Sequence, residues 1–216
     1  MDHPRDSRRR RLRPSPGTGC TLMSHNLGRI ICIELRRSKE RAASHRRNLV
    51  PIPCLPIMIA FIRCLAIEIE NQKEFLTRVR GSGTFTSTLL KSFEKNPTNE
   101  MVMICKYYGV RKATRSDAET LNQIRHEILH PAPYPEDWPM IPSYLRKLQK
   151  EGLLWTPPHE ALLCDTLEFF CSHELLKWAA VTIADIACAI LNSDTQYTHL
   201  NTTRYELVEE IRGNAV

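Results

Sequence analysis

Apolar residues recur at helical spacing along most of the chain from residue 57 onward. The longest apolar stripe has leucine, isoleucine or alanine at 175, 176, 179, 180, 183, 186, 187 and 190. A second stripe has apolar side chains at 58, 61, 62, 65, 66 and 69. Intervals of three and four residues place such side chains on one face of a helix. Neither the strict alternation of a half-buried strand nor an Asn-Gly hairpin turn occurs. The pattern therefore predicts an all-α protein.

Glycines, prolines and capping residues divide this pattern into separate helices. Ser116 and Asp165 each open a capping box with a glutamate three residues later, and Pro131 ends the helix that begins at Ser116. The predicted helices span 57–78, 86–95, 100–108, 116–130, 142–151, 165–192 and 203–211. We expect an up-and-down bundle of four to five helices over residues 55–192, followed by an amphipathic tail helix within 193–216.

The first 54 residues differ from the rest in charge. Residues 1–50 hold 13 lysine and arginine residues against four acidic ones, whereas residues 51–216 hold 17 against 20. The formal charge of +6 therefore comes from the N-terminal region, and the body is slightly acidic. Residues 1–19 combine arginines with prolines and offer little apolar surface to bury, which is typical of disorder, and 29–47 are compatible with a short amphipathic helix. We expect a basic, Pro-containing, largely disordered arm over 1–54 that can contact polyanions.

The cysteines and the uncharged segment 48–62 bear on the cellular compartment. The eight cysteines are scattered without a CxxC pair, which favours a reducing, cytoplasmic location over a disulfide scaffold. Segment 48–62 contains three prolines and is shorter than the roughly 20 apolar residues that span a bilayer, so we expect no membrane segment. No glycine-rich phosphate loop occurs, and we expect no bound cofactor.

One polar motif stands at the end of the predicted 116–130 helix. His126, Glu127 and His130 satisfy H-E-x-x-H, in which two histidines on one helix face bind zinc and the glutamate acts as base. The chain would then be a zinc hydrolase. Pro131 disfavours helical backbone at His130 and so weakens this interpretation. Candidates for a third ligand follow at Glu151, Glu160, Glu168 and His173.

A second interpretation starts one residue earlier, at Arg125. An arginine offers a fixed cation to phosphate oxygens, and a histidine such as His130 can take or give a proton near neutral pH. Together they suffice for metal-free attack of a ribose 2′-hydroxyl on its own phosphodiester, so the substrate would be RNA.

The motif Arg125-His126-x-x-x-His130 resembles that of the HEPN (higher eukaryote and prokaryote nucleotide-binding) domains. Their signature is Arg, then Asn, Asp or His, three variable residues and His, and Pro131 resembles the proline that follows in many bacterial members. The resemblance covers roughly residues 55–192. It implies a four-to-five-helix bundle that dimerises, and many such domains are RNases of toxin–antitoxin, abortive-infection or CRISPR systems.

The same resemblance implies roles for the three motif residues. Arg125 would clamp the phosphate, His130 would act as general acid and base, and His126 would be the polar orienting residue. The implied partners are RNA, a second copy of the chain and an antitoxin protein.

The alternative from another functional class is a non-catalytic helical interaction or RNA-binding module. In that case Arg125 pairs with Glu119 or Glu127, and His130 merely caps its helix. Five prolines lie within 131–142, which predicts a rigid loop beside His130.

Overall fold

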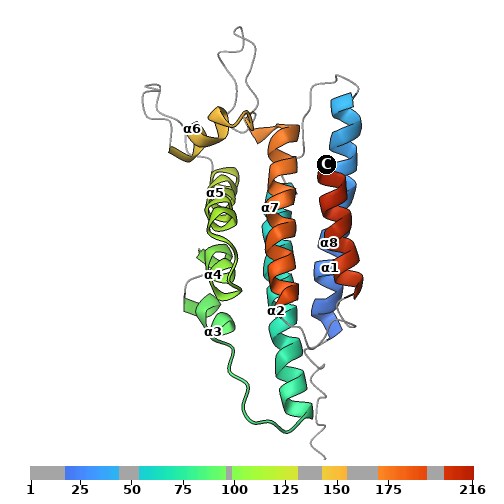
Figure 1. The fold of residues 1–216 in the computed structure, drawn as a ribbon, viewed down its shortest axis with the longest axis vertical. Coiled ribbons are helices and arrows are strands. Elements are labelled where there is room, and N and C mark those ends of the chain that lie inside the picture. The colour runs from blue at the N-terminus through green and yellow to red at the C-terminus, as the bar shows by residue number, and fades with distance from the viewer. Residues whose placement is uncertain (1–17, 44–53, 96–98, 131–142, 155–169, 194–201) are drawn as a thin grey trace, which may run out of the picture.

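The computed structural model describes residues 18–43, 54–95, 99–130, 143–154, 170–193 and 202–216, which form helices and no strand (Figure 1). The all-α prediction is confirmed for these residues. The helices are α1 (Thr18–Ala43), α2 (Cys54–Val79), α3 (Thr88–Lys95), α4 (Glu100–Tyr107), α5 (Lys112–Leu129), α6 (Ser143–Lys150), α7 (His173–Asn192) and α8 (Thr202–Ala215).

The long helices α1, α2, α7 and α8 lie side by side along the molecule (Figure 1). Helices α7 and α8 are antiparallel, because Tyr205 near the start of α8 donates to Asn192 at the end of α7. Further along α8, Arg212 donates to Asp185, which lies two turns back along α7. No helix in the described ranges is long and apolar enough to cross a membrane.

The apolar stripes of α2 and α7 form the centre of the core. Ile62 and Leu65 of α2, and Ile183 and Ile190 of α7, are at most 1% exposed. Burying side chains of this size contributes about 1.5–3 kcal/mol each, so these stripes supply much of the driving force for folding. The periodicity of both helices is therefore matched by the burial in the structure.

Helix α1 differs from the expected, largely disordered arm, because one helix covers 18–43 where only a short amphipathic helix over 29–47 was expected. It packs on α2 and α8, and its Ile31 and Leu35 are fully buried. Ser24, Gly28 and Ser38 continue the same buried face at helical spacing. The arginines of this segment lie on the opposite, exposed face, so a charge count over the segment hides its amphipathic character. Residues 1–17 and 44–53 of the expected arm lie outside the described residues.

Two helix starts also differ from the capping-box predictions. Helix α5 begins at Lys112, one turn before Ser116, because buried Thr114 extends its apolar face toward the N-terminus. Helix α7 begins after Ser172, whose side chain accepts a hydrogen bond from Leu175 N at 3.3 Å. The capping box at 165–168 lies outside the described residues. The remaining described helices begin and end within three or four residues of their predicted bounds.

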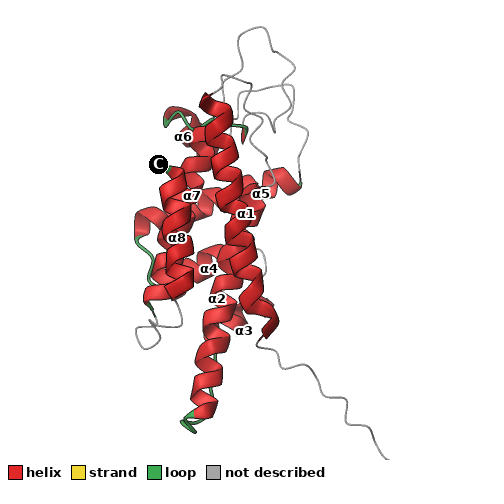
Figure 2. Ribbon diagram, turned by 90° about the vertical axis from the view of Figure 1, so that its right-hand side faces the viewer, coloured by secondary structure: helices red, strands yellow, loops and turns green. Residues whose placement is uncertain are grey.

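Helices α3, α4 and α5 lie on the opposite side of α2 and α7 from α1 and α8 (Figure 1). The end of α2 extends past its neighbours before the chain turns back toward α3 (Figure 2). Gly81 and Gly83 make this turn with φ of 65° and 104°, which glycine adopts at low cost. Helix α4 then contacts α2 and α5, and α5 contacts α2 and α7. This packing brings the motif helix against the body.

Candidate functional site

The C-terminal turn of α5 carries the predicted motif. The helix ends at Leu129, and His130 is its C-cap with φ of −136° and ψ of 63°. The His130 backbone N–H still donates to His126 O at 2.8 Å, so the last turn is closed. The following proline accounts for the extended φ of His130, because proline disfavours helical backbone in the residue before it.

The two histidines of the motif are neighbours on the surface. Their ring centroids are 5.1 Å apart and the rings are tilted by 51°. Both His126 and His130 are exposed to solvent. Residues four apart on a helix lie on one face, and the cap at His130 preserves that relation. A solvent-borne group can therefore reach both imidazoles together.

Arg125 is half-buried, and its charge acts on an ion pair built from two other helices. Arg63 Nε of α2 lies 3.0 Å from Glu100 Oε2, at the first residue of α4. Burial raises the pKa of the Glu100 carboxyl, and the positive charges of Arg63 and Arg125 oppose that rise. Glu100 is therefore a carboxylate on which the charge of Arg125 acts, in addition to the Glu119 and Glu127 that the interaction-module interpretation names.

The zinc interpretation needs a third ligand beside the two histidines. Among the described residues, no three His, Cys, Asp or Glu side chains gather to hold a metal ion. His173, one candidate, has its Nδ1 2.7 Å from the hydroxyl of buried Ser38. Glu160 and Glu168 lie outside the described residues. Within the described part of the chain, the H-E-x-x-H motif thus offers two imidazoles and the Glu127 carboxylate only.

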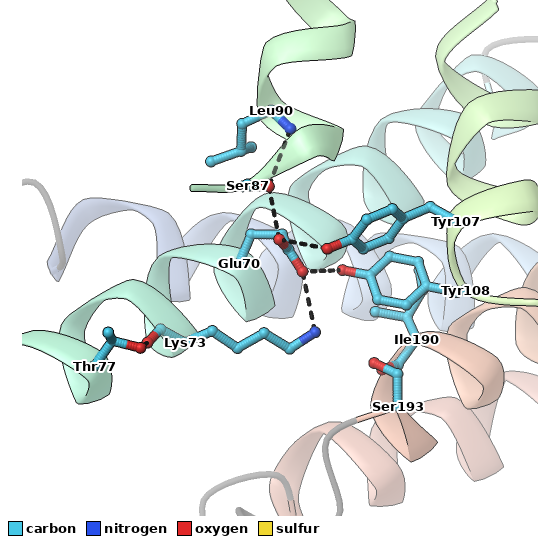
Figure 3. A network of polar contacts seen from close by, with 9 residues as sticks. All are labelled: Glu70, Lys73, Thr77, Ser87, Leu90, Tyr107, Tyr108, Ile190 and Ser193. Carbon is cyan, nitrogen blue, oxygen red and sulfur yellow. Dashed lines mark hydrogen bonds and ion pairs between the residues drawn. The ribbon is translucent and has the colours of Figure 1, made fainter. Parts of the chain in front are cut away.

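A cluster that the sequence did not predict surrounds the Glu70 carboxylate, which is fully buried (Figure 3). It accepts hydrogen bonds from Ser87 Oγ at 2.6 Å, Tyr107 OH at 3.1 Å and Tyr108 OH at 3.0 Å. Lys73 Nζ lies 3.0 Å away and supplies the positive charge. These partners come from α2, the cap of α3 and the end of α4, so Glu70 ties α4 to α2.

A second buried glutamate, Glu68, ties α2 to α1 and α8. Ser24 donates to it from the backbone at 3.3 Å and from the hydroxyl at 2.7 Å. Arg204 Nη2 completes the contact at 3.2 Å. Burial raises the pKa of the Glu68 carboxyl, and these partners oppose the rise. The sequence feature that could have indicated both buried contacts is the pair of acidic residues, Glu68 and Glu70, inside the otherwise apolar stretch of α2.

Comparison of the chain with protein-family models, with curated proteins and with solved structures finds no match. The functional interpretation therefore depends on the motif, its geometry and the resemblance described above. The proline-rich segment 131–142, expected to stand beside His130, lies outside the described residues.

Proposed function

We propose that the chain is a HEPN-like, metal-independent endoribonuclease of toxin–antitoxin or defence type. The observation that carries the proposal is the exposed pair of His126 and His130, adjoining half-buried Arg125 at the end of α5. The all-α fold and the packing of α5 on α2 and α7 agree with a four-to-five-helix bundle that presents its motif at a helix end.

In the proposed reaction the substrate supplies its own nucleophile. The ribose 2′-oxygen bonds to phosphorus while its proton passes to a base, and the bond from phosphorus to O5′ breaks as O5′ takes up a proton. His130 exchanges these protons and His126 orients the phosphodiester. Arg125 stabilises the charge that develops on the non-bridging oxygens. The products are a 2′,3′-cyclic phosphate and a 5′-hydroxyl.

The proposal includes a dimer in which two motifs approach each other. Leu129, between the two histidines in sequence, is 48% exposed, which gives the end of α5 an apolar side chain for such a contact. The further partners are RNA as substrate and an antitoxin protein that blocks the site.

The test is cleavage of single-stranded RNA by the full chain in the presence of a chelator. We expect His130→Ala and Arg125→Ala each to lower the rate by 100-fold or more, in the range for loss of a proton-transfer or charge-stabilising group, about 10²–10⁴. Lys112→Ala, at the opposite end of α5, is the matched control and retains activity. Activity that the chelator abolishes would support the zinc hydrolase instead. RNA binding without cleavage would support the non-catalytic module.

A further inference from the structure

Charged side chains of three helices interact beside the motif, because Arg63 contacts Glu100 and the charge of Arg125 acts on the same carboxyl. Glu100 begins α4, Arg63 lies in the first half of α2, and Arg125 lies in the last turns of α5. Helix α4 packs on both α2 and α5, and α2 also packs on α5. The cluster therefore belongs to a packed junction, and its charges are brought together by the fold rather than by sequence proximity.

Arg63 contacts Glu100 through its inner nitrogen. The 3.0 Å contact is made by Nε, and the side chain is 53% exposed. The two terminal nitrogens of the guanidinium lie beyond Nε and carry four of its five N–H donors. A guanidinium held at one nitrogen and open to solvent keeps the fork geometry that phosphate oxygens bind.

Glu100 supplies a negative charge that Arg63 contacts and on which the charge of Arg125 acts. Its side chain is only 15% exposed, and it lies in the first turn of α4, where the helix dipole favours a carboxylate. Two guanidinium groups repel each other, and a carboxylate that attracts both offsets that repulsion. Glu100 thereby holds Arg63 through a direct contact, and its charge attracts Arg125.

We propose that Arg63 is a second phosphate-binding cation of this site and that Glu100 is the positioning residue for both arginines. The proposal rests on the function proposed above, because it assigns the ligand of the same site as single-stranded RNA. Arg125 would bind the phosphodiester that reacts, and Arg63 would bind a neighbouring phosphate of the same strand. Such a contact fixes the register of the strand without reading its sequence.

Binding can be measured apart from cleavage by using a 2′-O-methyl RNA oligonucleotide, which lacks the attacking hydroxyl. Fluorescence anisotropy over a series of salt concentrations gives the slope of log K against log salt, which is about 0.7 per phosphate contact on a single strand. We expect Arg63→Ala and Arg125→Ala each to reduce the slope by about 0.7. Arg63→Lys should retain the slope. Arg78→Ala, which removes an exposed arginine that pairs with Glu74 on the same helix, is the matched control.

The substitution Glu100→Gln tests whether Glu100 positions the arginines or only stabilises the fold. Removing the carboxylate leaves two positive charges without their negative partner, so we expect tighter binding of the 2′-O-methyl RNA. Cleavage of unmodified RNA should become slower, because Arg125 is held less firmly. Opposite changes in binding and cleavage do not arise from a simple loss of folded protein. Parallel weakening of both would overturn the assignment of Glu100.

The outcomes distinguish this inference from the proposed function. A normal slope in Arg63→Ala beside a reduced slope in Arg125→Ala would overturn the role of Arg63 and leave the ribonuclease proposal standing. Wild-type protein that binds with the Arg63-dependent slope but leaves unmodified RNA intact would overturn the ribonuclease proposal and keep Arg63 as a phosphate-binding residue.

Discussion

The contact between α1 and α8 depends on Gly28, and its substitution by alanine should destabilise the protein. A Cβ atom at this position would lie 2.4 Å from Leu207 Cδ2 and 2.9 Å from Leu207 Cγ. Carbon atoms pack best at about 3.5–4.0 Å, so Leu207 would have to move by about 1 Å. Leu207 is only 5% exposed and has little room to do so.

The net effect of Gly28→Ala is the difference between two opposing contributions. Alanine in a helix interior gains about 0.5–1 kcal/mol over glycine. Overpacking a buried contact costs about 1–3 kcal/mol. We therefore expect Gly28→Ala to lower the free energy of unfolding by about 1 kcal/mol. Gly213→Ala on α8 is the matched control, because apart from its chain neighbours and the backbone of its own helix no atom lies within 4 Å of the added Cβ. It should be neutral or stabilising.

Urea unfolding followed by circular dichroism measures both substitutions, and a double-mutant cycle with Leu207→Ala isolates the contact. Leu207→Ala alone should cost about 2–5 kcal/mol. In the Gly28→Ala background it should cost about 1–3 kcal/mol less, because the shortened side chain relieves the overlap. Additive costs, or a stabilising Gly28→Ala, would refute the packing of α1 on α8.

Two further predictions concern buried polar contacts. Glu70→Gln should lower the free energy of unfolding by about 1–3 kcal/mol, because it removes the charge that Lys73 pairs with. Glu74→Gln on the same helix should lower it by at most about 0.5 kcal/mol. Urea unfolding at neutral pH measures both variants, and equal costs would contradict the role of Glu70. Burial lowers the pKa of His173 below 6.5 in the folded protein. His173 therefore binds more protons in the unfolded chain than in the folded protein as the pH falls through about 6.5. The stability that neutral His173 contributes through its contact with Ser38 is lost over that pH range. His173→Asn should therefore show a smaller loss of stability than wild type between about pH 8 and about pH 5.5, and identical pH dependence would contradict the prediction.

The helices that the sequence predicted well are those whose burial follows from local spacing. Apolar side chains at intervals of three and four residues mark α2 and α7 without reference to any other part of the chain. Of helix α1, the sequence indicated only a short amphipathic piece over 29–47, because the buried face also contains Ser24, Gly28 and Ser38, small or polar residues that count as core only when a neighbouring helix approaches closely. The identity of that neighbour is a tertiary property.

The candidate site also has one part that local spacing predicts and another part that depends on tertiary packing. Arg125, His126 and His130 lie on one helix end, so their spacing alone places the two histidines together. Arg63 and Glu100 come from α2 and α4, and nothing in their local sequence distinguishes them from the other charged residues of the chain. The packing of α4 on α2 and α5 brings Arg63 and Glu100 together, where the charge of Arg125 acts on the Glu100 carboxyl.

The most direct test of the proposed chemistry is the identity of the RNA ends that the protein releases. Single-stranded RNA is incubated with the full chain in the presence of a chelator, and the products are analysed by mass spectrometry. Attack by the 2′-hydroxyl predicts 2′,3′-cyclic phosphate and 5′-hydroxyl ends, formed by wild type and lost in His130→Ala. Products with 3′-hydroxyl and 5′-phosphate ends, or equal cleavage by His130→Ala, would contradict the account.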